Sequence, residues 1–165
     1  MQDSQWVFSD AQAMPNNVEV VTTNDIDWTA SKFKDWINSP IPIWFVFTCN
    51  DVPDAGTSIQ VEFYQHTARA ITDGDLLWAG PVVTLANLSA DPFNDGHWLA
   101  VVPLITLMTA AMIMGGQDRY MGPVLKAVGD MSTGKVDGWI HMGANPPVYV
   151  APPAIVGASN VVMPT

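Results

Sequence analysis

Residues Asp118–Gly143 read DRYMGPVLKAVGDMSTGKVDGWIHMG, and this stretch decides the fold class. Arg119–Val128 and Lys135–Met142 are both rich in strand-forming residues, and the Gly-Asp-Met-Ser-Thr-Gly segment between them is dense in turn formers. Along the second run the residues alternate between two faces, Val136, Gly138, Ile140 and Met142 on one and Asp137, Trp139 and His141 on the other. The pattern predicts an antiparallel hairpin without any obvious catalytic residue.

The rest of the chain carries many further short strand patterns, separated by Gly, Pro, Asn and Asp turns. We expect strands over Val18–Thr22, Ile41–Thr48, Ser58–Gln65, Leu76–Trp78, Val82–Leu85 and His97–Val102. Ile105–Met114 has the Leu, Met and Ala content of a helix, but we interpret it as a strand because it follows strands and ends at Gly115-Gly116. Only Thr29–Asn38 has helical spacing of apolar residues. These patterns predict an all-β, jelly-roll-like antiparallel β-sandwich with one short helix.

The composition limits the possible partners. The 165 residues correspond to one domain, which needs no disulfide or metal to be stable. Charged residues make up 13% of the chain, about half of the usual share. We therefore expect much of the surface to lie against other copies or a large partner; the alternative is a monomer with a polar, uncharged surface. The six Lys and Arg residues are scattered and the net charge is −10, which argues against direct nucleic-acid binding.

Residues 144–165, ANPPVYVAPPAIVGASNVVMPT, differ from the rest of the chain. They include five prolines and no charged side chain. Proline favours extended backbone and lacks a donor for a central strand, and the segment is too apolar for an ordinary linker. We expect a sandwich domain over residues 1–143, followed by an extended C-terminal arm over residues 144–165 that packs on a neighbouring subunit or another protein. An unordered terminus is the alternative.

No membrane or export signal is expected. The first ten residues lack the basic and apolar regions of a secretory signal, and the longest apolar run, Leu99–Met114, is shorter than the ~20 residues of a membrane span. We expect a soluble intracellular product without membrane contact. Cys49 is the single cysteine, and its apolar neighbours predict a buried structural thiol rather than a nucleophile.

The sequence offers no recognisable catalytic, cofactor or metal motif. The three histidines lie on separate segments, without the spacing of a zinc site. Asp73-Gly74-Asp75 and Asp91–Asp95 fit turns better than a calcium loop. No phosphate loop, dinucleotide glycine motif or nucleophile elbow is present. We therefore expect a protein that is not an enzyme and has no cofactor or metal; a hydrolase with two carboxylates brought together by the fold is the remaining enzymatic alternative.

Large aromatic and apolar side chains are the candidate interface residues, because such residues are enriched among binding anchors. We expect the core to hold Trp36 and Trp44, among seven tryptophans in the chain. The candidate interface residues are Trp6, Phe8, Trp78, Trp98 and Trp139 in the domain, and Val148, Tyr149, Ile155, Val161 and Val162 in the arm.

Several segments resemble one known family, the capsid cement (decoration) proteins of tailed bacteriophages. Val7–Met14, VFSDAQAM, followed by Val20–Asp27, VVTTNDID, is similar to the family's opening. Ala55–Gln65, AGTSIQVEFYQ, resembles its central strand. Arg119–Ile140 resembles its Arg-Tyr strand, Thr-x-Gly-Lys-Val segment and closing apolar strand. The markers occur in family order. Thr29–Asn38, the apolar run after His97 and the proline-rich arm depart from the pattern.

This resemblance implies a jelly-roll protein of the virion that is made in the host cytoplasm. Such proteins bind the outside of an icosahedral capsid, commonly as homotrimers, and bridge major capsid proteins against the pressure of packaged DNA. The alternative from another class is a carbohydrate-binding jelly-roll module, which the number of tryptophans and the loop aspartates favour.

Overall fold

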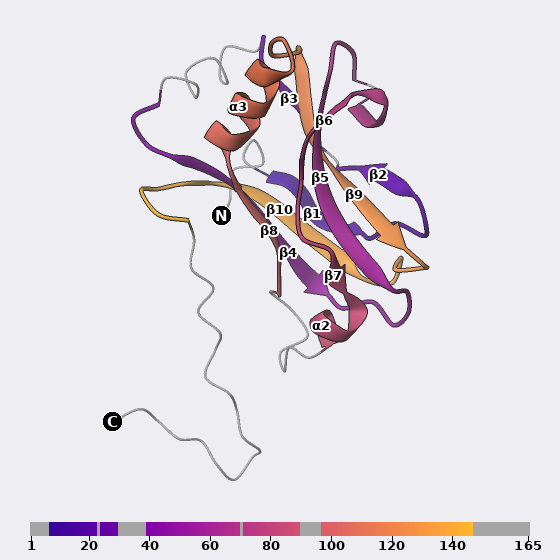
Figure 1. Ribbon diagram of the computed structural model, residues 1–165. Helices are drawn as coiled ribbons and strands as arrows, with labels where there is room; N and C mark the ends of the chain where they lie inside the picture. Colours follow the sequence, from indigo (N-terminus) through magenta and orange to yellow (C-terminus); the bar gives the residue numbers. More distant parts are fainter. Residues whose placement is uncertain (1–6, 23, 30–38, 70, 90–96, 147–165) are drawn as a thin grey trace, which may run out of the picture.

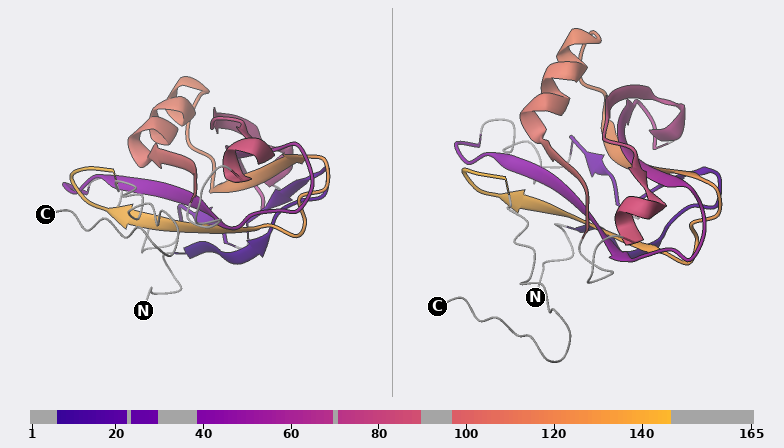
Figure 2. Two further views of the ribbon diagram at one scale, coloured as in Figure 1. Left: turned by 90° about the horizontal axis from the view of Figure 1, so that it is seen from below. Right: turned by 60° about the horizontal axis from the view of Figure 1, so that its bottom comes forward.

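The computed structural model describes residues 7–22, 24–29, 39–69, 71–89 and 97–146. It is an antiparallel β-sandwich, which confirms the expected fold class (Figure 1). Two sheets lie face to face and enclose one core. The longest described helix, α3 (Leu104–Ile113), stands at one end of the layers (Figure 2).

The first sheet has four strands in the order β1-β10-β4-β8. Its strands are β1 (Val7–Ala13), β10 (Lys135–Met142), β4 (Ile43–Asp51) and β8 (His97–Pro103). Neighbouring strands in this sheet are antiparallel, and β4 pairs with β10 from Ile43↔Met142 to Asp51↔Lys135. The bounds of β10 agree with those expected from the sequence.

The second sheet has six strands, with the order β2-β9-β5-β6 along its main path. Its long strands are β5 (Ser58–His66) and β9 (Tyr120–Val128), which pair along their whole length. The remaining strands are shorter: β2 (Glu19–Val21), β3 (Ile26–Asp27), β6 (Asp75–Ala79) and β7 (Val83–Thr84). Two short helical turns accompany them, η2 (Ile71–Asp73) and α2 (Leu85–Ser89).

Four phenylalanines from three strands form the centre of the core. Phe45 and Phe47 of β4 face Phe63 of β5, with ring centroids 5.3 and 5.8 Å from that of Phe63. Phe8 of β1 lies 5.2 Å from Phe45 and is 2% exposed. Alternating side chains of both sheets therefore meet between the layers, as the period of two in SIQVEFYQ predicts. Cys49 also lies here, fully buried.

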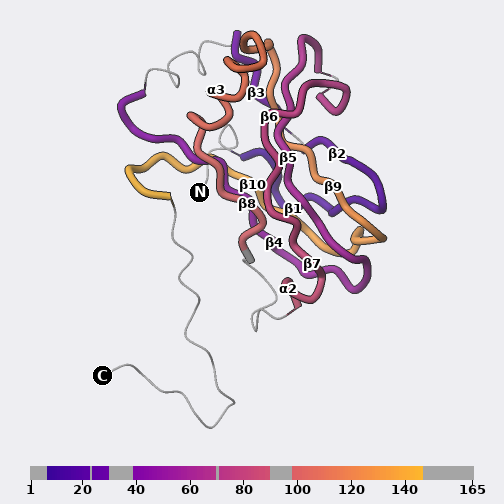
Figure 3. Tube along the Cα trace, in the orientation of Figure 1, coloured from indigo at the N-terminus to yellow at the C-terminus, as the bar shows by residue number. Residues whose placement is uncertain are grey.

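The hairpin expected over Asp118–Gly143 does not form. β9 and β10 form close to the expected bounds, but β9 pairs with β2, β3 and β5, whereas β10 pairs with β1 and β4. The connection over residues 129–134, which we call the arch, carries the chain from one sheet to the other (Figure 3). A turn-forming composition is common to hairpins and to such crossings, so the sequence did not distinguish them.

The arch is held by the connection between β1 and β2. Gly129 N–H donates to the Asn17 side chain at 3.2 Å, Asn17 N–H donates to the Gly129 carbonyl at 3.0 Å, and Met14 N–H donates to the Gly134 carbonyl at 2.9 Å. Gly129 has φ +82°, and a Cβ there would lie 2.9 Å from Gly56 Cα. Glycine is therefore required at position 129 both for its backbone conformation and for its packing.

Residues expected to form a strand over Ile105–Met114 form the helix α3 (Leu104–Ile113) instead. The helix propensity of Leu, Met and Ala prevails here, because the strand was expected only from the neighbouring strands and not from the residues of the segment itself. Leu104, Leu107, Met108 and Ala111 share the buried face. Gly115 and Gly116, with φ of +107° and +137°, end the helix by donating to the carbonyls of Met112 and Ala111.

Two of the expected elements lie largely in parts of the chain that the structure does not describe. The helix over Thr29–Asn38 and the arm beyond Pro146 lie outside the described residues. With α2 and α3, the described residues contain two α-helices where the sequence predicted none. β10 is the last of the described strands and ends at Met142, so the described strands all lie within the domain expected over residues 1–143.

Candidate interaction surfaces

The outer face of the four-stranded sheet is aromatic. Trp44, Trp98 and Trp139 alternate with core residues on β4, β8 and β10, and all three are half-buried. The indole N–H of Trp44 donates to the Gly143 carbonyl at 3.1 Å. Trp44 was expected in the core, and the strand does carry core residues, but Trp44 points to its other face. We call these three residues the aromatic face.

Trp98 and Trp139 approach each other over the strand that separates them. Their strands, β8 and β10, lie on either side of β4, and their ring centroids are only 6.3 Å apart. Val46 of β4, which pairs with Trp139 and with Val101, is fully buried although it points away from the main core. The two indole rings thus cover part of their own sheet, so only the rest of their apolar surface is open to a partner.

The outer face of the six-stranded sheet is ionic. Lys126 of β9 lies 2.7 Å from a Glu19 carboxylate oxygen and 3.9 Å from a Glu62 oxygen. The Tyr64 hydroxyl donates to Glu62 at 2.7 Å. Burial, with the neighbouring Glu62 carboxylate, raises the pKa of Tyr64 to about 12, while the hydrogen bond to Glu19 raises the pKa of Lys126. Glu19 and Glu62 thus share one lysine, whose single positive charge offsets one of the two carboxylate charges.

A second polar cluster lies where β3 meets the start of β9. Arg119 donates to both oxygens of Asp27, with Nη2 at 2.9 Å from Oδ2 and Nε at 3.3 Å from each. Thr29 donates to the same carboxylate through its backbone and its hydroxyl. The Arg119 and Thr29 hydrogen bonds hold the pKa of Asp27 well below its usual range. The guanidinium groups of Arg69 and Arg119 lie over the Tyr120 ring at 5.5 and 4.8 Å.

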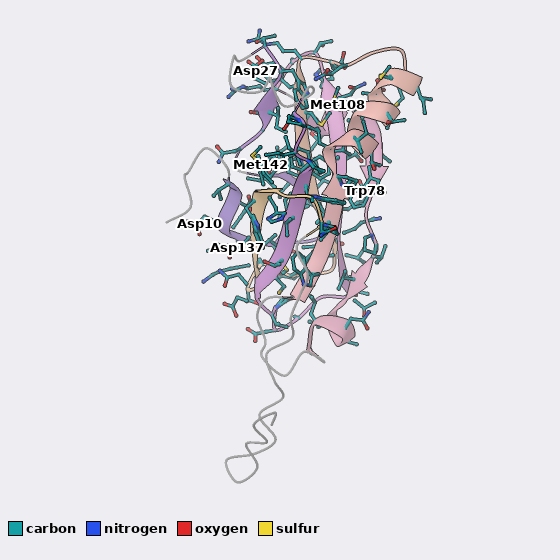
Figure 4. The ribbon with its side chains drawn as sticks, turned by 90° about the vertical axis from the view of Figure 1, so that its left-hand side faces the viewer. Asp10, Asp27, Trp78, Met108, Asp137 and Met142 are labelled. Carbon is teal, nitrogen blue, oxygen red and sulfur yellow. The ribbon has the colours of Figure 1, made fainter. Side chains whose placement is uncertain are left out.

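An apolar groove of about 210 Å³ runs between α3 and the start of β4. One wall is formed by Ile41, Pro42 and Ile43. The other wall is α3, through Leu104, Ile105, Met108 and Met112, and Ser39 is the single polar residue in the lining. Figure 4 labels Met108 on α3 and Met142 at the end of β10, the strand that pairs with Ile43.

Large apolar side chains remain exposed around this groove. Ile105, Met112 and Ile113 are 70%, 74% and 81% exposed, and Met114, Ile41 and Met142 are also exposed. No residue of α3 is charged, because its sequence is LITLMTAAMI. Contiguous exposed apolar surface on a soluble domain usually marks a contact site for another protein or for a ligand. We call this region, the groove with its exposed rim, the α3 surface.

The interface residues that the sequence predicted lie in different environments in the structure. Phe8 is wrong as an interface residue: it is 2% exposed because its strand directs it between the sheets, against Phe45 and Phe47. Trp78 packs against the core at the edge strand β6, with its ring 6.3 Å from that of Phe63. Trp98 and Trp139 do come together. Trp6, Val148, Tyr149, Ile155, Val161 and Val162 lie outside the described residues.

The α3 surface was missed by the sequence analysis. A strand over Ile105–Met114 would direct alternate residues into the core, so this interpretation does not predict one continuous exposed apolar face. The signal was present in the sequence: Leu104, Leu107, Met108 and Ala111 have helical spacing, and the other positions of the helix include Ile105, Met112 and Ile113 but no charged residue. A helix that exposes large apolar side chains and carries no charge at the surface of a domain predicts a partner.

Within the part of the chain that the structure describes, no helix is long and apolar enough to cross a membrane. The described residues also contain no group of three or more His, Cys, Asp or Glu side chains placed to hold a metal ion. His66 and His141 lie half-buried on strands, as expected of sheet-face histidines. A scan of the sequence against protein-family models finds no match, and a search of curated proteins finds none either.

Proposed function

We propose that this chain is a capsid cement protein, which binds the outer surface of an icosahedral bacteriophage shell and bridges its major capsid proteins. The observation that carries the proposal is the α3 surface, where a charge-free helix exposes Ile105, Met112 and Ile113. Such a surface fits burial against another protein better than it fits catalysis. The segments that resemble cement proteins, including Val7–Met14 and Arg119–Ile140, support a major capsid protein as that partner.

We infer further that the sandwich is of the jelly-roll type. The strand orders β1-β10-β4-β8 and β2-β9-β5-β6 place the first strand beside the last, and the chain changes sheet at most of its connections. Two four-stranded antiparallel layers with interleaved Greek-key connections define a jelly roll. This inference supports the cement proposal because the family it resembles has that fold.

The physical role proposed for the protein is to add contact area that exists only in the closed shell. Many copies bind a repeated lattice, so avidity makes modest individual contacts sufficient. A homotrimer would match a three-fold position of the lattice. The net charge of −10 keeps the outward surface soluble. On this proposal the protein is not an enzyme and has no cofactor, and it resides on the capsid exterior.

Cosedimentation with purified shells tests the proposal. We expect the protein to pellet with the shells and to raise the temperature at which they open. A variant with Ile113→Asp and Met114→Asp, at the exposed end of α3, should bind at least about tenfold more weakly, because charge would be buried against the shell. Val82→Asp, at a site that is 58% exposed just before β7 of the six-stranded sheet, is the matched control. Shells equally resistant to heat with and without the protein would refute the proposal.

A second candidate function is carbohydrate binding, which the Trp98–Trp139 pair favours. Two indole rings with centroids 6.3 Å apart on one sheet face offer an aromatic platform for a sugar ring. A glycan array distinguishes the two functions. Binding that is lost with Trp139→Ala and kept with the Ile113→Asp, Met114→Asp variant would favour a lectin; an array without any binding would remove this candidate.

A further inference from the structure

The groove of the α3 surface has the size and chemistry of a site for peptide side chains. Its volume of about 210 Å³ is below the roughly 300–1,000 Å³ of pockets for small molecules. Its lining is apolar apart from Ser39, and two methionines, Met108 and Met112, allow it to adapt to different side chains. One or two aliphatic side chains of an extended segment would fill it.

The chain itself contains a segment of matching chemistry, and this segment starts at the groove. Gly143 N–H donates to the carbonyl of Pro42, a lining residue, at 3.0 Å, and Met142 pairs with Ile43, another lining residue. The described chain ends three residues later, at Pro146. Residues 147–165 then follow, mostly apolar and without a charged side chain in a protein of net charge −10. Neither surface carries a charge that the contact would have to desolvate.

The spacing of the prolines favours a groove on another copy over the chain's own groove. Pro146-Pro147 and Pro152-Pro153 lie at the two ends of the first part of this segment. Proline-rich backbone extends by about 3.1 Å per residue and resists reversal, so this part would span roughly 20 Å away from its starting point. Ile155 and Val156, the first large aliphatic pair after the second proline pair, would then be held away from the neighbouring groove of their own chain.

We propose that the α3 groove binds the C-terminal segment of a second copy of this chain, with Ile155 and Val156 as the anchoring side chains. Each copy gives its segment to one neighbour and receives one from another. This contact is heterologous, so it closes only in a ring, and a ring of three copies would satisfy every groove. The inference concerns contacts between copies in solution and goes beyond the proposed binding to a capsid.

Disulfide trapping tests the contact directly, because Cys49 is fully buried and leaves a silent background. Protein with Met112→Cys is mixed with protein with Ile155→Cys under mild oxidation. We expect a covalent dimer of one chain of each kind on a non-reducing gel. Met112→Cys with Ser159→Cys is the matched control and should cross-link at least about fivefold less. Equal cross-linking of both pairs would overturn the assignment of Ile155, as would a double variant in one chain that forms only an intrachain disulfide.

Light scattering of the full-length chain provides a second test that does not depend on cysteine chemistry. Ile105→Asp with Met112→Asp places two carboxylates in the groove at sites 70% and 74% exposed, which a folded domain tolerates. We expect the dissociation constant of the oligomer to rise by at least about tenfold, and Ile113→Asp, on the same helix but outside the groove, to leave it unchanged. Equal weakening by both variants, or a wild-type chain that is monomeric at all concentrations, would refute the proposal.

If the oligomer forms as expected but the protein does not bind shells, the inference stands and the capsid proposal fails. If shells are bound by a chain that stays monomeric, the reverse holds. The two ideas are therefore tested separately by the same set of variants.

Discussion

The two sheets of the sandwich share one core but differ on their outer faces. The four-stranded sheet presents Trp44, Trp98 and Trp139, whereas the six-stranded sheet presents the Glu19–Lys126–Glu62 network with Tyr64. Both faces follow the same alternation along their strands, so the backbone does not cause the difference. The alternation along a strand determines which positions point outward, whereas the type of residue at those positions reflects the solvent or partner that each face contacts.

The largest expected effect comes from breaking what the two sheets have in common. Phe63→Ala removes the ring of β5 that contacts Phe45, Phe47 and Phe8 across the layers. We expect the free energy of unfolding to fall by about 3–5 kcal/mol, since a fully buried aromatic side chain leaves a cavity. Urea denaturation followed by tryptophan fluorescence and by circular dichroism measures it. Two separate transitions would contradict the view that the sheets unfold together.

The arch that joins the sheets should be the next most sensitive feature. Gly129→Ala places a Cβ 2.9 Å from Gly56 Cα, at a residue with φ +82°, and should cost about 1–3 kcal/mol of unfolding free energy. Gly115→Ala, with φ +107° but no heavy atom within 4 Å of the new Cβ, is the matched control for backbone strain alone. If thermal denaturation shows equal losses for both variants, the packing of Gly129 on Gly56 is not important.

Replacement of one residue on each outer face sharpens the comparison between them. Trp139→Ala uncovers Val46 and should lower the free energy of unfolding by about 1–2 kcal/mol through exposed apolar area. Lys126→Ala, on the ionic face, should cost less, about 0–1 kcal/mol, because its side chain is half-exposed and screened by solvent. Chemical denaturation of both variants in parallel tests the order, and a larger loss for Lys126→Ala would reverse it.

The ionic face should also give the sandwich a response to alkaline pH. The folded protein holds the Tyr64 proton more tightly than the unfolded chain, because the pKa of Tyr64 is raised from 10.0 to about 12. The corresponding stability is present below pH 10 and is lost as the pH rises toward 12. Thermal melts between pH 8 and pH 12 should show a steeper decline in wild type than in Tyr64→Phe. Parallel curves would show that Tyr64 is not the group responsible.

The smallest expected effect lies in acid, at the Asp27–Arg119 pair. The pKa of Asp27 is held below its ordinary value of 3.8, so its contribution is present above that pH and is lost as the pH falls below it. Melting temperatures of wild type and Asp27→Asn should therefore differ at pH 6, and the difference should shrink steadily as the pH falls below 3.8. Asp130, whose pKa is lowered by hydrogen bonds from Ser132, contributes in the same range, so the variant should be less pH-dependent but not insensitive. A constant difference would exclude Asp27 as the cause.

Much of the sandwich was predictable from local sequence, and the parts that were missed share a cause. The bounds of β10 and the two faces of β5 follow from a period of two, which depends only on neighbouring residues. Which strands pair depends on contacts between distant residues, so the arch was interpreted as a hairpin. Ile105–Met114 was assigned from its neighbourhood rather than its composition, and the α3 surface was missed with it.

The predicted interface residues differ in their exposure, and the difference has a physical reason. An aromatic residue looks the same in sequence whether its strand turns it inward or outward, and Phe8 turns inward. Trp98 and Trp139 lie close together on one sheet, and their role in an interface stays a prediction; their approach over β4 follows only once β8 and β10 are known to flank that strand. The Asp27–Arg119 pair likewise joins residues that only the pairing of β3 with β9 brings together.

The pairing of β1 with β10 has a consequence for how the chain folds. Val7 of the first strand pairs with Trp139 of the last, and few connections in the sandwich join adjacent strands of one sheet. Contacts between residues so distant in sequence slow folding, because a long loop must close before they form. During synthesis β1 lacks the strand with which it pairs, β10, until nearly the whole domain has been translated. We therefore expect slow refolding and a strong dependence of expression yield on temperature, with the exposed early strands as the vulnerable species.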